Sequence, residues 1–311
     1  MPSSSPRPRL PPISQSQAAQ LMYDTRAPQY ENSWHPAFSA RLMRLVSARP
    51  GDRVLVLACG SGLESFIAAD LVGPGGEVVG VDISAGMLTQ ARTRQAAEAD
   101  IGRRITFLSG DVTDLGAVAG LRERKEGEAG EKGFDIVICS SAFVLFEDPA
   151  AVVRGWRSWL KSGNGKEEQT GSGNGGGDGG RLVIDITHEC NLVPGLVIEK
   201  VARDMGVRWP SNRLWIKGRE SFRHILEAEG YVVERIEVVD GVADLEVTSY
   251  GVDEADRQFE EVTKSAAMRW IWEGQDMQRA RRLFGEEWRR IAVDGRVEVS
   301  DKVYVYIARP A

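Results

Sequence analysis

The most constraining part of the chain is the stretch from Val54 to Asp82, which reads VLVLACGSG, then an apolar-faced segment, then EVVGVD. The unbroken apolar run from Val54 to Leu57 is typical of a parallel strand covered on both faces. The small residues that follow permit a tight turn and close approach of a ligand to the main chain, and residues 65–72 predict a helix whose free N–H groups face that turn. Asp82 ends the next strand about 20 residues on, where a carboxylate can accept both hydroxyls of a ribose. This order of features predicts a nucleoside-binding site.

The spacing of the glycines narrows the ligand class. A dinucleotide fingerprint requires G-x-G-x-x-G, and here Gly60 and Gly62 are followed by Ser65 at the third position. The Gly-Lys-Ser/Thr ending of a phosphate-binding loop is absent from this turn. The turn therefore suits a ribose-bearing ligand without a pyrophosphate.

With these features the sequence resembles the class I S-adenosylmethionine-dependent methyltransferases, in particular the group similar to the ubiquinone/menaquinone enzymes. VLVLACGSG and VVGVDISAGML resemble the first two motifs of that family, and FLSGDVTDL, FDIVICSSAFVLFEDP and GGRLVIDI resemble the next three. The segment YDTRAPQYENSW, residues 23–34, resembles the part of the family that closes over the cofactor. The resemblance spans residues 20–240 and says nothing about the substrate.

The resemblance implies an α/β fold: a doubly wound, seven-stranded, mostly parallel sheet of the Rossmann-like methyltransferase type, with helical additions. We expect strands at residues 54–57, 77–82, 105–108, 134–139, 182–186, 231–238 and 303–308, the last two forming an antiparallel edge pair. We expect helices at residues 37–48, 85–98 (capped by Ser84), 149–160, 191–206, 255–270 and 277–291.

The domain organisation follows from the same interpretation. We expect a disordered, Pro- and Ser-rich tail over residues 1–20 and one methyltransferase domain over residues 21–311. Residues 162–180 are rich in glycine and hold no large apolar side chain, so we expect a disordered surface insertion. Residues 187–230 and 240–300 are expected to be helical additions on the substrate side, and their tryptophans either line a substrate pocket or attach these helices to the core.

The resemblance also implies roles for individual residues in binding S-adenosylmethionine. Gly60 and Gly62 would contact its methionine part, and Asp82 would hold the ribose. The other expected cofactor contacts are Ala58 in the turn, Ile83 and Met87 beside the adenine, Asp111 and Val112 at the adenine edge, Ser140 and Ser141 on the sulfonium side, and Tyr23 and Tyr30 as caps. The chain departs from the family at Val56, where a carboxylate that helps to hold the cofactor's amino group is usual.

A hydroxyl acceptor would need a base near its proton, and the chain holds three histidines. His188 follows the fifth predicted strand, at the edge of the sheet where ligands bind, and is the first candidate. His35, in the closing segment, is the second, and His224 is expected to be structural. For His188, the alternative is a histidine that is hydrogen-bonded in a loop.

Composition limits the function classes. The formal net charge of −6 argues against a nucleic-acid partner, and no apolar run reaches membrane-spanning length. Three widely spaced cysteines without zinc-ligand spacing fit reduced thiols and a cytoplasmic location, with no metal site. The oligomeric state is not encoded in any recognisable pattern.

We therefore expect an S-adenosylmethionine-dependent methyltransferase of secondary metabolism, acting on a small aromatic or polyketide-like metabolite. Methylation of oxygen is slightly favoured over methylation of carbon. The alternatives are a quinone-precursor C-methyltransferase, and a methyltransferase-fold scaffold or non-methylating protein that binds the cofactor weakly, for which Val56 is the main support.

Overall fold

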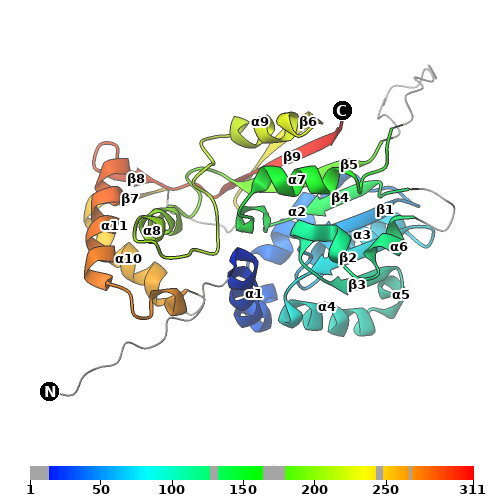
Figure 1. Cartoon of the computed structure of the whole chain (residues 1–311), viewed down its shortest axis with the longest axis horizontal. Coiled ribbons are helices and arrows are strands. Elements are labelled where there is room, and N and C mark those ends of the chain that lie inside the picture. Colours follow the sequence, from blue (N-terminus) through cyan, green and yellow to red (C-terminus); the bar gives the residue numbers. More distant parts are fainter. Residues whose placement is uncertain (1–13, 127–131, 164–178, 243–247, 266–267) are drawn as a thin grey trace.

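The fold is built on one large sheet (Figure 1). The computed structural model describes residues 14–126, 132–163, 179–242, 248–265 and 268–311. The sheet has seven strands in the order β3-β2-β1-β4-β5-β9-β6. The first five strands in this order, β3, β2, β1, β4 and β5, are parallel to one another. β9 pairs antiparallel with both β5 and β6. The strands are β1 Arg53–Leu57, β2 Glu77–Asp82, β3 Ile105–Ser109, β4 Ile136–Cys139, β5 Arg181–Thr187, β6 Tyr231–Asp240 and β9 Lys302–Pro310. This arrangement confirms the predicted doubly wound, mostly parallel fold with an antiparallel edge.

Alternation along the strands gives the sheet two apolar faces. In β1, Leu55 and Leu57 enter one buried cluster, and Val54 and Val56 enter the other. The first cluster is covered by α7 and α9, and the second by α2, α3 and α4. The helices are α2 His35–Val46, α3 Leu63–Val72, α4 Ala85–Ala97, α5 Ala99–Gly102, α6 Leu121–Lys125, α7 Pro149–Arg157 and α9 Glu220–Ala228. Burial on both faces explains why every residue of β1 is buried.

A third cluster lies to one side of the sheet, among α8 Val193–Asp204, α10 Ala255–Lys264 and α11 Met277–Ile291 (Figure 1). A short two-stranded sheet, β7 Ser249–Gly251 with β8 Arg296–Glu298, packs with these helices and was not predicted. Trp209, Trp272 and Trp288 are buried in this cluster, where they attach the helices to one another. Short 3₁₀ turns complete the chain: η1 Ala27–Asn32, η2 Val112–Ala117, η3 Phe143–Leu145, η4 Val252–Glu254 and η5 Arg269–Trp272.

The N-terminal helix α1, Gln15–Arg26, contradicts the prediction of a disordered tail over residues 1–20. Ser14 and Gln17 form a reciprocal cap: the Ser14 hydroxyl accepts from the Gln17 N–H at 3.1 Å, and the Gln17 side chain accepts from the Ser14 N–H at 2.8 Å. Ala18 and Ala19 are buried, so tertiary packing adds to the cap. Residues 1–13 of the predicted tail lie outside the described residues.

Other predicted boundaries shift by a few residues. Ser84 caps α4 as predicted, with its hydroxyl accepting from the Met87 N–H at 3.1 Å. Helix α7 ends at Arg157 rather than near residue 160, and β4 begins at Ile136 rather than at residue 134. None of the described helices has the length and apolarity needed to cross a membrane.

Most of the predicted glycine-rich insertion, residues 164–178, lies outside the described residues, but its flanks are held together. The Gly180 N–H donates to the Lys161 carbonyl at 2.9 Å, and the Lys161 N–H donates to Phe134 O at 2.9 Å. A Cβ on Gly180 would lie 2.5 Å from that same oxygen, so only glycine fits at this junction.

Because the flanks are already bonded, replacing residues 164–178 with a short Gly-Ser linker should shift the melting temperature by only about 2 °C, since closure entropy varies slowly with loop length. Thermal unfolding of both proteins checks this. Gly180→Ala, which forces a backbone contact, should lower the melting temperature clearly. A large loss of stability in the linker variant would show that the segment is part of the fold.

Candidate active site

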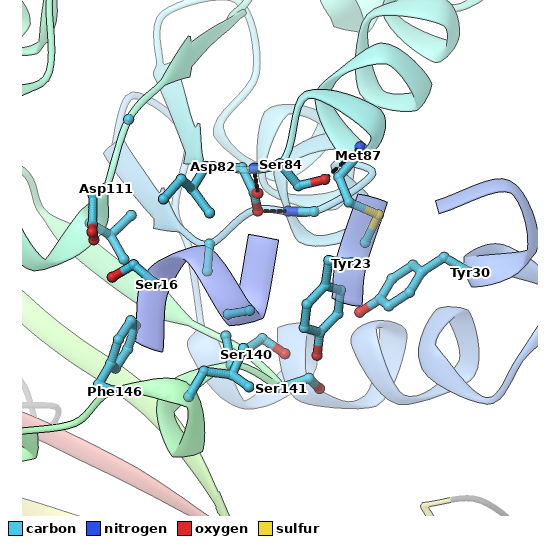
Figure 2. A pocket seen from close by; sticks show the side chains of 18 residues that line it. Ser16, Tyr23, Tyr30, Asp82, Ser84, Met87, Asp111, Ser140, Ser141 and Phe146 are labelled. Atoms are coloured by element: carbon cyan, nitrogen blue, oxygen red, sulfur yellow. Dashed lines mark hydrogen bonds between the residues drawn. The ribbon is translucent and has the colours of Figure 1, made fainter. Parts of the chain in front are cut away.

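A cavity opens at the carboxyl ends of β1 to β4, and segments from both halves of the sheet line it (Figure 2). Its space, with the open mouth included, is about 640 Å³. All predicted cofactor residues except Gly62 line it: Tyr23, Tyr30, Ala58, Gly60, Asp82, Ile83, Met87, Asp111, Val112, Ser140 and Ser141. Folding therefore collects in one place residues that are spread over more than a hundred positions.

Asp82 joins the two loops that form the floor of this cavity. One carboxylate oxygen accepts from the Gly60 N–H at 2.8 Å, and the other accepts from the Ser84 N–H at 2.8 Å (Figure 2). Burial raises the pKa of Asp82, and these N–H donors oppose that rise. Each oxygen has a second lone pair, so the carboxylate can still accept hydrogen bonds from a ligand.

The turn after β1 is held in a conformation that few side chains tolerate. Ala58 has φ 51° and Gly60 has φ 55°. A Cβ on Gly60 would lie 3.2 Å from Met87 Cε, so glycine keeps this wall of the cavity open. Gly62 sits behind the cavity instead: it begins α3, and a Cβ there would lie 3.0 Å from Phe107 Cζ. The structure therefore gives Gly62 a packing role and does not bring it to the lining.

The N-terminal segment covers the cavity, as expected for residues 23–34. Tyr23 comes from α1 and Tyr30 from η1, and their rings lie edge to face 6.2 Å apart (Figure 2). Asp24 attaches the segment to the start of α4, with one oxygen accepting from the Ser84 hydroxyl at 2.5 Å and from the Gly86 N–H at 3.0 Å. Gln15 donates to the Leu145 carbonyl at 2.8 Å. The cover is thus fixed at both ends of α1.

A second, larger cavity adjoins the first. The two share Tyr23, Ser141, Ala142 and Leu145 in their linings. The second extends beyond the carboxyl end of β5 and is walled by the additional helices α8 and α10. A ligand of the first cavity and a ligand of the second would therefore meet beside Ser141.

Asp185 of β5 lines the second cavity next to this junction and was not predicted. Its carboxylate accepts from the Ser141 N–H at 2.7 Å, and Ser141 holds φ 54° to present that N–H. Burial raises the pKa of Asp185 to about 7; the Ser141 N–H lowers it and the charge of Glu64 raises it. An aspartate inside the apolar run of the fifth strand was the available signal, because buried carboxylates without a function are uncommon.

The structure separates the two candidate histidines. His35 lines the second cavity, stacked on Trp34 with ring centroids 3.8 Å apart. Burial, together with the positive charge of Arg26, lowers the pKa of His35 to about 3. A group this weakly basic is a poor general base near neutral pH.

His188 is not brought to the cavity. Its ring stacks on Tyr304 with centroids 5.1 Å apart, and its Nδ1 accepts from the Cys190 N–H at 3.1 Å. Alternation explains this: Asp185 and Thr187 line the cavity, so His188 falls on the opposite face of the strand. His224 lies in α9, away from both cavities.

Val56, where the family usually has a carboxylate, is buried in the apolar cluster beneath α2 and α3. A different carboxylate, that of Glu64 in α3, is buried at the same edge of the sheet and accepts from the Ser39 hydroxyl at 2.6 Å. Glu64 is near enough to raise the pKa values of Tyr30 and Asp185. Negative charge is therefore present at this edge despite Val56.

Comparison with known proteins agrees with this geometry. Residues 48–165 match a family described as "Methyltransferase domain". The nocamycin O-methyltransferase of Saccharothrix syringae is 37% identical over 39% of this chain and 38% of its own length. The demethylmenaquinone methyltransferase of Symbiobacterium thermophilum is 43% identical over 26% of this chain and 31% of its own length. The matches thus span less than half the length of these relatives.

Solved structures show the same fold over nearly the whole chain. The [4+2]-cyclase SpnF has a TM-score of 0.56 at 15% identity, covering 98% of this chain and 99% of its own. YjhP of E. coli has a TM-score of 0.51 at 18% identity, covering 94% and 100%. At these identities the likeness concerns the fold alone.

Asp82→Ala should weaken binding of S-adenosylmethionine by about tenfold or more, because the ribose hydroxyls lose a charged acceptor. Titration calorimetry measures the change, and a thermal melt verifies that the loops tied by Asp82 stay folded. Asp70→Ala, on the exposed side of α3, is the matched control and should leave the dissociation constant unchanged. An unaltered affinity in folded Asp82→Ala would remove Asp82 from the site.

Proposed function

We propose that this chain, whose residues 48–165 match a methyltransferase domain, is a class I S-adenosylmethionine-dependent methyltransferase. It transfers the cofactor's methyl group to a small acceptor held in the second cavity. The observation that carries the proposal is the junction of the two cavities at Tyr23 and Ser141, with Asp185 beside it. The acceptor is a small aromatic or polyketide-like metabolite, and methylation of oxygen is favoured over methylation of carbon.

The residues of the first cavity fit the cofactor. Ser140 presents a buried hydroxyl to the cavity beside the Asp185 carboxylate, and Asp82 keeps free lone pairs. In the proposed assignment Asp82 holds the ribose, Ile83 and Met87 flank the adenine, and Gly60 contacts the methionine part. Asp111 and Val112 meet the adenine edge, Ser140 and Ser141 lie on the sulfonium side, and Tyr23 and Tyr30 exclude water above it.

When bound, S-adenosylmethionine supplies an electrophilic methyl group, so alignment of the acceptor provides much of the rate. The remaining need is a group that takes the acceptor's proton. Asp185 is suited to this because it faces the acceptor cavity and the pKa of its carboxyl is raised to about 7. His35 forms part of the acceptor wall and stays neutral, since its pKa is about 3.

The additional helices define the acceptor side. Leu192 and Pro194 at the start of α8, and Gln258 and Val262 of α10, line the second cavity. This supports treating residues 187–230 and 240–300 as substrate-side additions to one domain. All three cysteines are free, which supports a reducing compartment, the cytoplasm.

Two alternatives follow from specific observations. The quinone methyltransferase names among the relatives support a quinone-precursor C-methyltransferase. Val56, which is buried among apolar side chains, supports a methyltransferase-fold scaffold or non-methylating protein that binds the cofactor weakly. Against the latter, Glu64 supplies a buried carboxylate in the first turn of α3, at the same edge of the sheet.

The proposed function is tested in two steps. Titration calorimetry with S-adenosylmethionine and S-adenosylhomocysteine should show binding of both, which a scaffold with weak affinity would not. Incubation with methyl-labelled S-adenosylmethionine and a metabolite library should then yield a labelled product, whose bond, oxygen–methyl or carbon–methyl, separates the remaining candidates. Tight cofactor binding without any labelled product would favour the non-methylating alternative.

Asp185→Asn should lower turnover of the identified acceptor by about 10²-fold or more while cofactor affinity is kept. Wild-type kcat/KM should rise with pH through about 7, as Asp185 ionises, and the rise should be absent in the variant. His188→Ala is the matched control and should keep full activity. A retained pH profile in Asp185→Asn would exclude Asp185 as the base.

The pH dependence of the free energy of unfolding provides an independent check on the pKa of Asp185. Because the pKa of Asp185 is raised from 3.8 to about 7, the folded state binds the extra proton between these values. The free energy of unfolding should therefore fall as pH rises from about 4 to about 7. Urea unfolding at both ends of this range should show the fall in the wild type and a smaller one in Asp185→Asn.

A further inference from the structure

Resting on the proposed function, we propose that the acceptor carries an oxyanion, a carboxylate or an enolate. In the second cavity this group is bound by Arg213, which follows α8, and by Gln258 of α10. Both residues line the second cavity, which extends beyond the carboxyl end of β5. The inference concerns only recognition of the acceptor and adds no chemical step.

Arg213 is a buried cation on the wall of this cavity, with 7% of its surface exposed. Its Nε lies 3.5 Å from a carboxylate oxygen of Glu199, and its Nη1 donates to the Asn191 carbonyl at 3.4 Å. Both contacts are long, so they only partly satisfy five N–H donors. The guanidinium of Arg213 can therefore donate further hydrogen bonds to a ligand oxygen.

Arg213 shares the carboxylate of Glu199 with a second guanidinium group. Glu199, fully buried in α8, also contacts Arg203 at 3.4 Å, so one carboxylate faces two guanidinium groups. The Ser211 hydroxyl donates to Glu199 at 2.7 Å, which further occupies that carboxylate. The cluster therefore carries one excess positive charge, and Arg213 is its member on the cavity wall.

The first turn of α8 adds to this field. Leu192, Pro194 and Gly195 line the cavity, and the 12-residue helix has no side-chain cap at its N-terminus. Pro194 has no N–H and the Gly195 N–H donates to the Leu192 carbonyl, so this helix end contributes through its dipole, which favours negative charge. A Cβ on Gly195 would lie 2.9 Å from Nη2 of Arg213, so glycine leaves the guanidinium its place.

Gln258 of α10 is a second polar residue on the wall of this cavity, and it supports the proposal independently of Arg213. It is 2% exposed, it lines the same cavity, and its amide nitrogen has no hydrogen-bond partner among the described residues. A buried donor without a partner is costly unless a ligand satisfies it. Glu261, on the same helix, does not neutralise the region, because it is exposed and bonded to Arg257 at 2.8 Å.

The experiment measures binding rather than turnover, so it is separate from the test of methyl transfer. The full chain, saturated with S-adenosylhomocysteine, is titrated with 1-hydroxy-2-naphthoate, with the corresponding carboxamide, and with 1-naphthol. Wild type should bind the carboxylate at least about tenfold more tightly than 1-naphthol, because a charged hydrogen-bonded contact is lost in the latter. The affinity for the carboxamide should lie between those for the carboxylate and for 1-naphthol.

Variants assign this preference to residues. Gln258→Leu should reduce the affinity for carboxylate and carboxamide several-fold and leave 1-naphthol unchanged. Arg213→Lys keeps the charge beside Glu199 but loses the planar guanidinium. Its affinity for the carboxylate probe should fall more than its affinity for the other two probes. Gln278→Leu, the same change on the exposed face of α11, is the control.

Equal affinity of wild type for the three probes, or no detectable binding of any, would overturn the proposal. So would a carboxylate preference that survives Gln258→Leu and Arg213→Lys unchanged. Normal binding of S-adenosylhomocysteine in the same samples would show that such a failure concerns the acceptor subsite and not the proposed function.

Discussion

The hydrogen bonds of Asp82 hold the cofactor end of the site together. One carboxylate joins the turn after β1 to the turn after β2 through the N–H groups of Gly60 and Ser84. Ser84 in turn caps α4 and donates its hydroxyl to Asp24 of the covering segment. A single buried charge therefore links two strands, one helix and the N-terminal cover. Its burial is tolerated because the free N–H groups at this edge of the sheet need acceptors.

Backbone strain concentrates around the two cavities. Among the described residues, five that are not glycine adopt left-handed conformations. Three of them, Ala58, Ser141 and Leu192, line a cavity wall, whereas Ser47 and Asp294 line neither cavity. Such conformations persist where surrounding contacts over-determine them, and they are frequent at functional sites. At Ser141 the strain has a visible result, since it directs an N–H at Asp185. The raised pKa of Asp185 then follows from its burial at the junction.

The additional helices wall the second cavity, which we propose holds the acceptor. Phe259, Phe284 and Trp288 form a separate apolar cluster with α8, which fixes these helices as a unit. This packing brings a buried ion pair, Arg213 with Glu199, to the cavity wall. Removing one member of such a pair leaves an uncompensated charge and is strongly destabilising, which is why the conservative lysine variant is the informative one.

The sequence by itself determined the sheet and the cofactor end of the site, because both depend on local patterns. Apolar runs mark the parallel strands, and the turn residues and Asp82 keep fixed offsets from them. Gly62 shows the limit of such patterns, since its close contact with Phe107 became visible only in three dimensions. The helix at Gln15 escaped prediction because its stability comes from buried alanines as well as from its cap.

Only the tertiary structure decided which residues line the second cavity. Asp185 and His188 both stand near the end of β5, and a strand that is apolar on both faces gives no sign of which face meets the cavity. Alternation places Asp185 in the cavity and His188 against Tyr304. Arg213 and Gln258 come from segments 45 residues apart that meet through helix packing. No local pattern encodes that meeting, because it is set by which apolar faces are buried together.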